Sequence, residues 1–100
     1  MCARGEEALT AASEAVRAAS GVDVLSIRAD VSRPEDVSRL VSSAIAKFGR
    51  IDILVTNAGG PPSGNFESLD PEKWDNAVRQ TLLSAVNLCR ETLHRLLHRD

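Results

Sequence analysis

Asn57-Ala58-Gly59-Gly60 is the turn of this chain best suited to contact a ligand, and it follows the mainly apolar run 51–55. An apolar run bounded by turn residues is typical of a strand buried on both faces, as in a parallel sheet. The glycines let the backbone leave the strand sharply and let another molecule approach it closely. Because ligands of open α/β sheets lie beyond the carboxyl ends of the strands, we predict that this strand delivers a ligand-contacting turn.

Three side chains near the C-terminus could bind a metal or attack a substrate. His94 and His98 are four residues apart, which places them on one helix face at a spacing that can hold zinc. We find no carboxylate or cysteine placed to complete a ligand set, so a solvated helix end near the C-terminal dipole is favoured and no metal site is predicted. Cys89 has no base placed to activate it, which indicates a core residue rather than a nucleophile.

Composition and charge exclude several classes of function. The net charge is −2, and the chain has one Trp, two Phe and no Tyr, so it offers neither a basic footprint nor a stacking platform for nucleic acid. No apolar run approaches the roughly 20 residues that a membrane span needs. Cys2 and Cys89 are far apart and form no metal-ligand spacing, which favours a reduced, cytoplasmic protein.

Helix and strand patterns alternate along the first half of the chain. Residues 6–19 are rich in alanine and end before Gly21, which predicts a short amphipathic helix. Residues 22–29 carry several β-favouring apolar side chains, which predicts a strand. A further strand should precede the first helix, and we expect it to be missing or nearly so because only three residues come before Arg4.

The helix expected over residues 32–48 has the clearest boundaries. Ser32 and Glu35 have the spacing of a capping box, Pro34 suits the first helical turn, and Gly49 ends the helix. Apolar residues between them recur at i, i+3, i+4 and i+7, as on a helix with one buried stripe. With a strand on either side, this helix predicts a βαβ unit, whose crossover joins parallel strands.

A loop over residues 58–69 leads to the longest predicted element, the helix 70–98. Asp70 is its expected N-cap and Pro71 its first helical residue. Apolar side chains are spread widely round this helix, which indicates burial on more than one side. We expect one side to cover the sheet and the other to meet a second subunit.

Four features, which follow one another along the chain in the order that the family has, resemble the short-chain dehydrogenase/reductase family. Asn57-Ala58-Gly59 resembles the family's Asn-Ala-Gly motif, Asp30-Val31 its acidic pair at the adenine, and Ala3-Arg4 the end of its second strand in members that prefer NADP. Trp74 and the long helix resemble the fifth helix, which helps form the dimer. The loop and the long helix look most like bacterial 3-oxoacyl-[acyl-carrier-protein] reductases.

The resemblance implies an α/β fold, a partial Rossmann-like doubly wound parallel sheet in the order helix–strand–helix–strand–long helix. Residues 1–100 would form one partial NAD(P)-binding domain, an internal fragment of the family's fold. NADP is favoured over NAD as the cofactor. The residues that the resemblance assigns to cofactor binding are Arg4, Asp30, Val31, Asn57, Ala58 and Gly59.

Each implied role has a plainer alternative. Arg4 would grip the ribose 2′-phosphate with paired, charge-assisted hydrogen bonds, or be a solvated arginine at a helix start. Asp30 would accept a hydrogen bond from the adenine amino group, with the backbone of Val31 supporting the ring. Alternatively, Asp30 is an acid placed near a helix N-terminus, where it interacts favourably with the helix dipole, and the two roles are compatible. Asn57 would shape the cleft while Ala58 and Gly59 leave room for the ribose, or the stretch is a plain strand-ending turn.

The chain also departs from the family pattern. Counting from Trp74, Thr81 stands where the family has a helix asparagine tied to a water of the proton relay. The family's Gly-rich pyrophosphate turn, catalytic Ser and Tyr-x-x-x-Lys have no counterpart, and the chain contains no Tyr. We therefore expect no catalytic residue among these 100 residues and no activity from this chain alone.

The resemblance implies a fragment of an NADP(H)-dependent oxidoreductase that transfers a hydride between nicotinamide and a small carbonyl or alcohol substrate, a 3-oxoacyl thioester being one candidate. It also implies a homo-oligomer formed through the helix 70–98. The first alternative is a non-catalytic nucleotide-binding or dimerisation module derived from the same family. The second is a structural or interaction module without a ligand.

Overall fold

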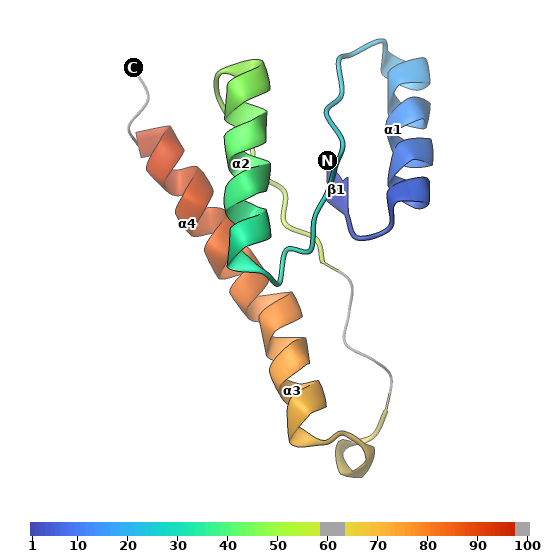
Figure 1. Cartoon of the computed structure of the whole chain (residues 1–100), viewed down its shortest axis with the longest axis vertical. Coiled ribbons are helices and arrows are strands. Elements are labelled where there is room, and N and C mark those ends of the chain that lie inside the picture. Colours follow the sequence, from blue (N-terminus) through green and yellow to red (C-terminus); the bar gives the residue numbers. More distant parts are fainter. Residues whose placement is uncertain (59–63, 98–100) are drawn as a thin grey trace.

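The computed structural model describes residues 1–58 and 64–97, in which α1 lies on one side of a short strand pair and α2 with α4 on the other (Figure 1). The elements in chain order are β1 (Cys2–Ala3), α1 (Glu6–Ser20), β2 (Ile27–Arg28), α2 (Pro34–Phe48), the 3₁₀ turn η1 (Phe66–Ser68), α3 (Pro71–Val78), the π-helical turn η2 (Arg79–Leu83) and α4 (Ser84–Leu97).

The strands β1 and β2 pair in parallel, with Cys2 opposite Ile27 and Ala3 opposite Arg28. The pairing extends past the assigned strands, because the Ala29 amide donates to the Ala3 carbonyl at 3.0 Å. The strand expected before α1 is therefore present as a two-residue piece, and the predicted strand 22–29 is confirmed only near its end. A parallel pair needs a crossover connection, and here α1 supplies it.

Two glycines end the first two helices as their positions predict. Gly21 has φ 70° and its amide donates to the Arg17 carbonyl at 2.8 Å, while Gly49 has φ 84° and donates to the Ile45 carbonyl at 2.8 Å. This left-handed backbone is accessible to glycine without the penalty that a Cβ brings. The start of α2 differs from its prediction, because its N-cap is Arg33 and no side chain caps the helix.

The main core lies between α2 and α4. Val37 and Val41 of α2 and Leu88 of α4 are buried and form one cluster. The partly buried side chains packed against this cluster are Val31, Leu40, Ile45, Ile51 and Leu54. Since Ile51 and Leu54 belong to the segment before the Asn-Ala-Gly turn, this core also anchors that turn.

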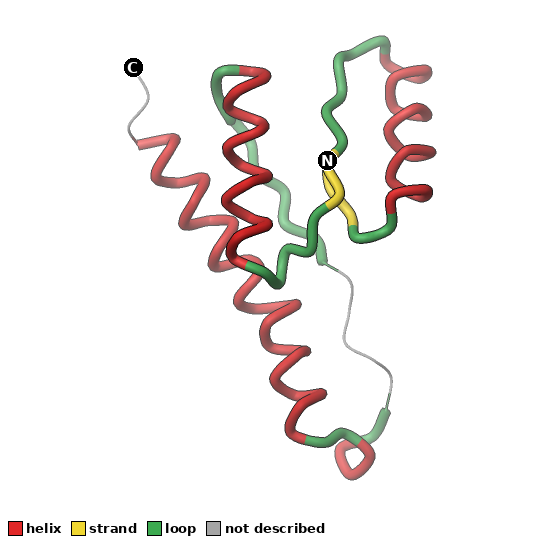
Figure 2. The backbone as a smooth tube through the Cα atoms, viewed as in Figure 1, coloured by secondary structure: helices red, strands yellow, loops and turns green. Residues whose placement is uncertain are grey.

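The prediction of a strand buried on both faces at residues 51–57 is wrong for the described structure. The segment runs beside α2 as a loop outside the strand pair (Figure 2). Ile53 and Val55 are 83% and 80% exposed, while Ile51 and Leu54 are half-buried. A strand exists through hydrogen bonds to a neighbouring strand, and in residues 1–58 and 64–97 the two strands pair with each other rather than with this segment.

The long C-terminal helix begins as predicted and then changes its winding. The Asp70 side chain caps it by accepting the Lys73 amide at 2.9 Å, and Pro71 is the first helical residue. The π turn η2 separates α3 from α4, in the middle of the predicted helix. No helix in the described ranges combines the length and the apolarity needed to cross a membrane.

Candidate functional site

A cavity of about 950 Å³ opens where the ends of β1 and β2 meet the segment 51–58 and the turn η2. Residues from all these elements contribute to its wall, although they are distant in sequence. Among the predicted site residues, those that line it are Arg4, Asp30, Val31, Asn57, Ala58 and Thr81. The remaining one, Gly59, lies outside the described residues. The fold thus brings together almost the whole set that sequence reasoning singled out.

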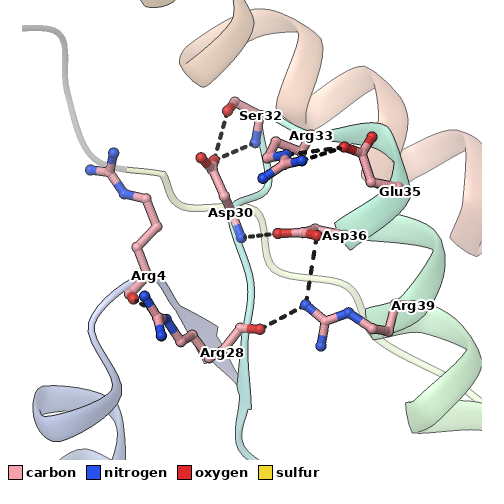
Figure 3. Close-up of polar contacts among 8 residues, drawn as sticks. All are labelled: Arg4, Arg28, Asp30, Ser32, Arg33, Glu35, Asp36 and Arg39. Carbon is pink, nitrogen blue, oxygen red and sulfur yellow. Dashed lines mark hydrogen bonds and ion pairs between the residues drawn. The ribbon is translucent and has the colours of Figure 1, made fainter.

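Asp30 is held as an ionised carboxylate at this cavity (Figure 3). Its Oδ1 atom accepts the Ser32 hydroxyl at 2.6 Å and the Ser32 amide at 3.0 Å. The hydroxyl bond is the largest influence on the pKa of Asp30 and lowers it, while the Arg4 and Arg33 charges lower it further and partial burial opposes them. Asp30 is therefore a negatively charged hydrogen-bond acceptor at neutral pH.

The bonds to Asp30 also explain why the predicted capping box is wrong. Ser32 donates its hydroxyl to Asp30 instead of accepting a helix amide, and α2 begins after it. An aspartate that accepts the amide two residues ahead forms a local turn that competes with a helix cap. The Asp30-Val31-Ser32 spacing was the signal for this turn, and the capping-box interpretation overlooked it.

A chain of polar contacts, which we call the strand-end network, ties the ends of β1 and β2 to α2 (Figure 3). Asp36 Oδ2 accepts the Asp30 amide at 2.8 Å, and Asp36 Oδ1 lies 3.7 Å from Arg39 Nη2. Arg39 Nη2 donates to the Arg28 carbonyl at 2.8 Å, and Arg28 Nε donates to the Arg4 carbonyl at 3.1 Å. The network fixes the backbone of Arg4 and Asp30 relative to each other.

Arg28, Asp36 and Arg39 were not singled out from the sequence. Surface arginines and an acid in the first turn of a helix carry no distinctive pattern, and their contacts depend on how α2 docks beside the strands. These residues line a second, smaller cavity of about 390 Å³. Its full lining is Arg4, Arg28, Ala29, Asp30, Arg33, Asp36 and Arg39. Arg4 and Asp30 border both cavities.

Thr81 faces the larger cavity from the π turn η2. Its hydroxyl donates to the Ala77 carbonyl at 2.6 Å, and the Ser84 hydroxyl in the same wall donates to the Gln80 carbonyl at 2.5 Å. Such bonds to the preceding turn are typical of helical Ser and Thr. With its proton used in this way, Thr81 Oγ1 can accept a hydrogen bond from a ligand or a water, and π turns often occur at functional sites.

The side chains considered as metal ligands or nucleophiles lie elsewhere. Cys89 is exposed, so its prediction as a core residue is wrong. The buried face of α4 contains Leu88, and the next residue points about 100° round the helix from it. His94 is exposed, and His98 lies outside the described residues. Within those residues no group of three or more His, Cys, Asp or Glu side chains is arranged to hold a metal ion.

Comparison with known proteins decides the family. The sequence model for short chain dehydrogenase matches residues 1–100. The chain belongs to the short-chain dehydrogenase/reductase family. Family membership, the α/β class and the partial Rossmann-like architecture expected from the sequence are thereby confirmed, since the solved structures similar to this chain are members of the family.

Individual family members match nearly all of this chain but only part of their own length. The acetoacetyl-CoA reductase of Allochromatium vinosum is 32% identical over 98 residues, which is 98% of this chain and 40% of that protein. L-sorbose reductase from Gluconobacter frateurii, solved with NADPH and L-sorbose, is 33% identical with a TM-score of 0.88, over 95% of this chain and 36% of that one. Actinorhodin polyketide ketoreductase, solved with NADPH, is 33% identical with a TM-score of 0.85, over 92% and 35% respectively.

Proposed function

We propose that this chain is the adenosine-binding part of an NADP(H)-dependent oxidoreductase, which transfers a hydride between nicotinamide and a carbonyl or alcohol carbon. The proposal depends on one observation, the convergence of Arg4, Asp30, Val31, Asn57 and Ala58 on a single cavity. They come from three separate segments, and the cavity lies at the carboxyl ends of the strands, where α/β folds bind their ligands.

The donors and acceptors present fit the adenosine end of NADP(H). Both bonds from Ser32 go to Oδ1 of Asp30, so within the described ranges Oδ2 stays available to accept the adenine amino group. The half-buried side chain of Val31 adjoins it and offers an apolar edge to the purine. Arg4 is exposed at the cavity wall, and a guanidinium matches the geometry of a phosphate. NADPH bound here would supply the hydride, and these residues would bind and orient it.

A 3-oxoacyl thioester is the substrate class that we propose for the reaction. The support comes from the similarity to a protein named for acetoacetyl-CoA, whose acyl group carries a 3-oxo group, and to a polyketide ketoreductase. On this chain Gln80, Thr81 and Ser84 of the C-terminal helical segment form a polar part of the wall of the same cavity. The chain contains no Tyr, so a tyrosine proton donor cannot come from these 100 residues.

We also propose that copies of the protein associate through the helix 70–98, in the cytoplasm. Apolar side chains at a spacing of four, Trp74, Val78, Leu82 and Val86, are all more than 40% exposed, and so is Leu93. Side chains four apart share one helix face, so they form a stripe that a second copy could cover. The same stripe supports the second candidate function, a dimerisation or nucleotide-binding module without activity.

Nucleotide binding by the intact gene product tests the proposal, measured by calorimetry with NADP⁺ and NAD⁺. We expect NADP⁺ to bind more tightly, Arg4→Ala to weaken NADP⁺ about tenfold with little effect on NAD⁺, and Asp30→Asn to weaken both. Arg90→Ala, which changes an exposed arginine of α4 outside the cavity, is the matched control. Failure to bind either dinucleotide would rule out the proposed function.

Turnover separates the enzyme from the module without activity. We expect the intact gene product to oxidise NADPH with acetoacetyl-CoA as the acceptor, and the Arg4→Ala variant to require a higher NADPH concentration for the same rate. Tight NADPH binding with no turnover of 3-oxoacyl thioesters or simple ketones would favour the module instead. For the oligomer, Leu82→Glu should shift sedimentation toward the monomer. Lys73→Glu, at an exposed position about 100° round the helix from Trp74 and outside the stripe, is its control.

A further inference from the structure

Four arginines line the smaller cavity, and two of them are neutralised by carboxylates. Arg33 Nη2 lies 2.9 Å from Glu35 Oε1, and Arg33 Nε donates to the same oxygen at 3.0 Å. Arg39 Nη2 lies 3.7 Å from Asp36 Oδ1 and also donates to a backbone carbonyl. The positive charges of these two side chains are therefore already matched by acids on α2.

Arg28 differs from both, because its hydrogen bond goes to an uncharged group. Its Nε donates to the Arg4 carbonyl at 3.1 Å, and among the described residues it forms no ion pair with a carboxylate. The bond uses one of the five guanidinium donors and leaves the fork of the Arg28 side chain oriented beside the Arg4 main chain (Figure 3). Arg28 thus keeps its full charge and most of its donors.

The strand register explains why Arg28 is next to Arg4. Ala3 on β1 is opposite Arg28 on β2, so Arg4 and Arg28 leave the strand pair at the same edge. Both residues line the smaller cavity, and both are exposed at its wall. In Figure 3 the Arg28 guanidinium group lies beside the Arg4 main chain and the Arg4 guanidinium group lies at the far end of the Arg4 side chain, so the two charges border the region in which an adenosine ribose would lie if Asp30 accepted the adenine amino group.

We propose that Arg28 is a specificity-determining residue that holds the ribose 2′-phosphate of NADP(H) together with Arg4. This inference rests on the proposed function and extends it to a residue on β2. A phosphate monoester carries a charge of about −1.5 to −2 at pH 7, which two guanidinium groups match better than one. NAD(H) has a hydroxyl group at the same position, so it gains no ion pair from Arg28.

A bracing role is the competing explanation, since Arg28 also links the ends of β1 and β2. The variant Arg28→Gln separates the two roles. The glutamine Nε2 stands at the same position along the side chain as the arginine Nε, so it can still donate to the Arg4 carbonyl. The substitution therefore keeps the brace and removes the charge and the fork.

The experiment measures four dissociation constants for the intact gene product, those of NADP⁺, NAD⁺, adenosine 2′,5′-bisphosphate and 5′-AMP. With Arg28→Gln we expect the two ligands that carry a 2′-phosphate to bind about tenfold more weakly and the two without it to change less than about twofold. Arg33→Gln removes one positive charge from the same cavity, and as the matched control it should change none of the four constants by more than about twofold.

The other outcomes overturn the inference in distinguishable ways. An equal loss for all four ligands would mean that Arg28 only braces the strands, and no loss would mean that it does not meet the phosphate. A protein that binds the bisphosphate but neither dinucleotide would contradict the proposed function, while the Arg28 test could still be read from the bisphosphate and AMP. If the unmodified protein bound none of the four ligands, the proposed function and the role of Arg28 would both be overturned.

Discussion

The strand β1 and the segment 51–57 border the same cavity, but different forces hold them there. Parallel backbone hydrogen bonds to β2 fix β1. The segment 51–57 has no strand partner among the described residues, and it is anchored by the side chains of Ile51 and Leu54 on the α2–α4 core. A short, weakly apolar piece of chain is thus a strand, and a long apolar run is not, because pairing rather than composition makes a strand.

Amide hydrogen exchange should show the largest contrast between the two regions in the chain of residues 1–100. The amides of Ile27 and Ala29 donate to carbonyls at 3.1 and 3.0 Å, so we expect them to exchange at least about a hundredfold more slowly than unstructured amides. The amides of Ile53 and Val55 should exchange near the unstructured rate. Equal protection of both pairs would show that the segment is hydrogen-bonded and that the contrast is wrong.

A matched pair of Val→Ala substitutions tests how each region is held. Val37 is fully buried at 0% exposure, whereas Val55 is 80% exposed. Val37→Ala should lower the free energy of unfolding by about 2 kcal/mol, because it leaves a cavity in the core that supports the segment. Val55→Ala removes the same atoms and should change it by less than about 0.5 kcal/mol, as denaturant melts would report.

Asp36→Ala removes polar contacts of the strand-end network and leaves the apolar side chains of the α2–α4 core in place. The Asp30 amide would lose its acceptor at 2.8 Å and Arg39 its carboxylate, so we expect a loss of stability of about 1 kcal/mol. Binding of NADP⁺ and NAD⁺ should weaken together, because the network positions Asp30 rather than the 2′-phosphate. Asp36→Asn keeps an acceptor oxygen and serves as the control, and it should recover most of both losses.

Ser32→Ala should change stability the least of these substitutions, because it acts only through the pKa of the Asp30 carboxyl group. The Ser32 hydroxyl is the main cause of the lowered pKa, so removing it should raise the Asp30 pKa toward its ordinary value of about 3.9. Since the folded pKa lies below the unfolded one, the stabilisation is present above about pH 3.9 and is lost as the pH falls through the folded value. Carboxyl NMR titrations should show the pKa of Asp30 rising in the variant, and an unchanged pKa of Asp30 would contradict this role of Ser32.

Most of the candidate site could be proposed from the sequence because its residues stand in short motifs that resemble those of a known family. Arg4 precedes a helix, Asp30 follows a strand pattern, and Asn57 ends an apolar run. Arg28, Asp36 and Arg39 could not be proposed, because each acts through a backbone group or a charge brought close by docking. Thr81 was found by its position, but its bond to Ala77 and the π turn around it were not predicted.

The sequence alone determined where α1 and α2 end and which side chain caps the start of α3. Gly21, Gly49 and Asp70 act through bonds that span no more than four residues, so the local chain contains all the information needed. Only the tertiary structure decided that residues 2–3 pair with residues 27–28 and that the segment 51–57 lies outside this strand pair. Strand pairing and the wall of a cavity need partners from distant parts of the chain, and no local pattern of residue types specifies which partner is reached.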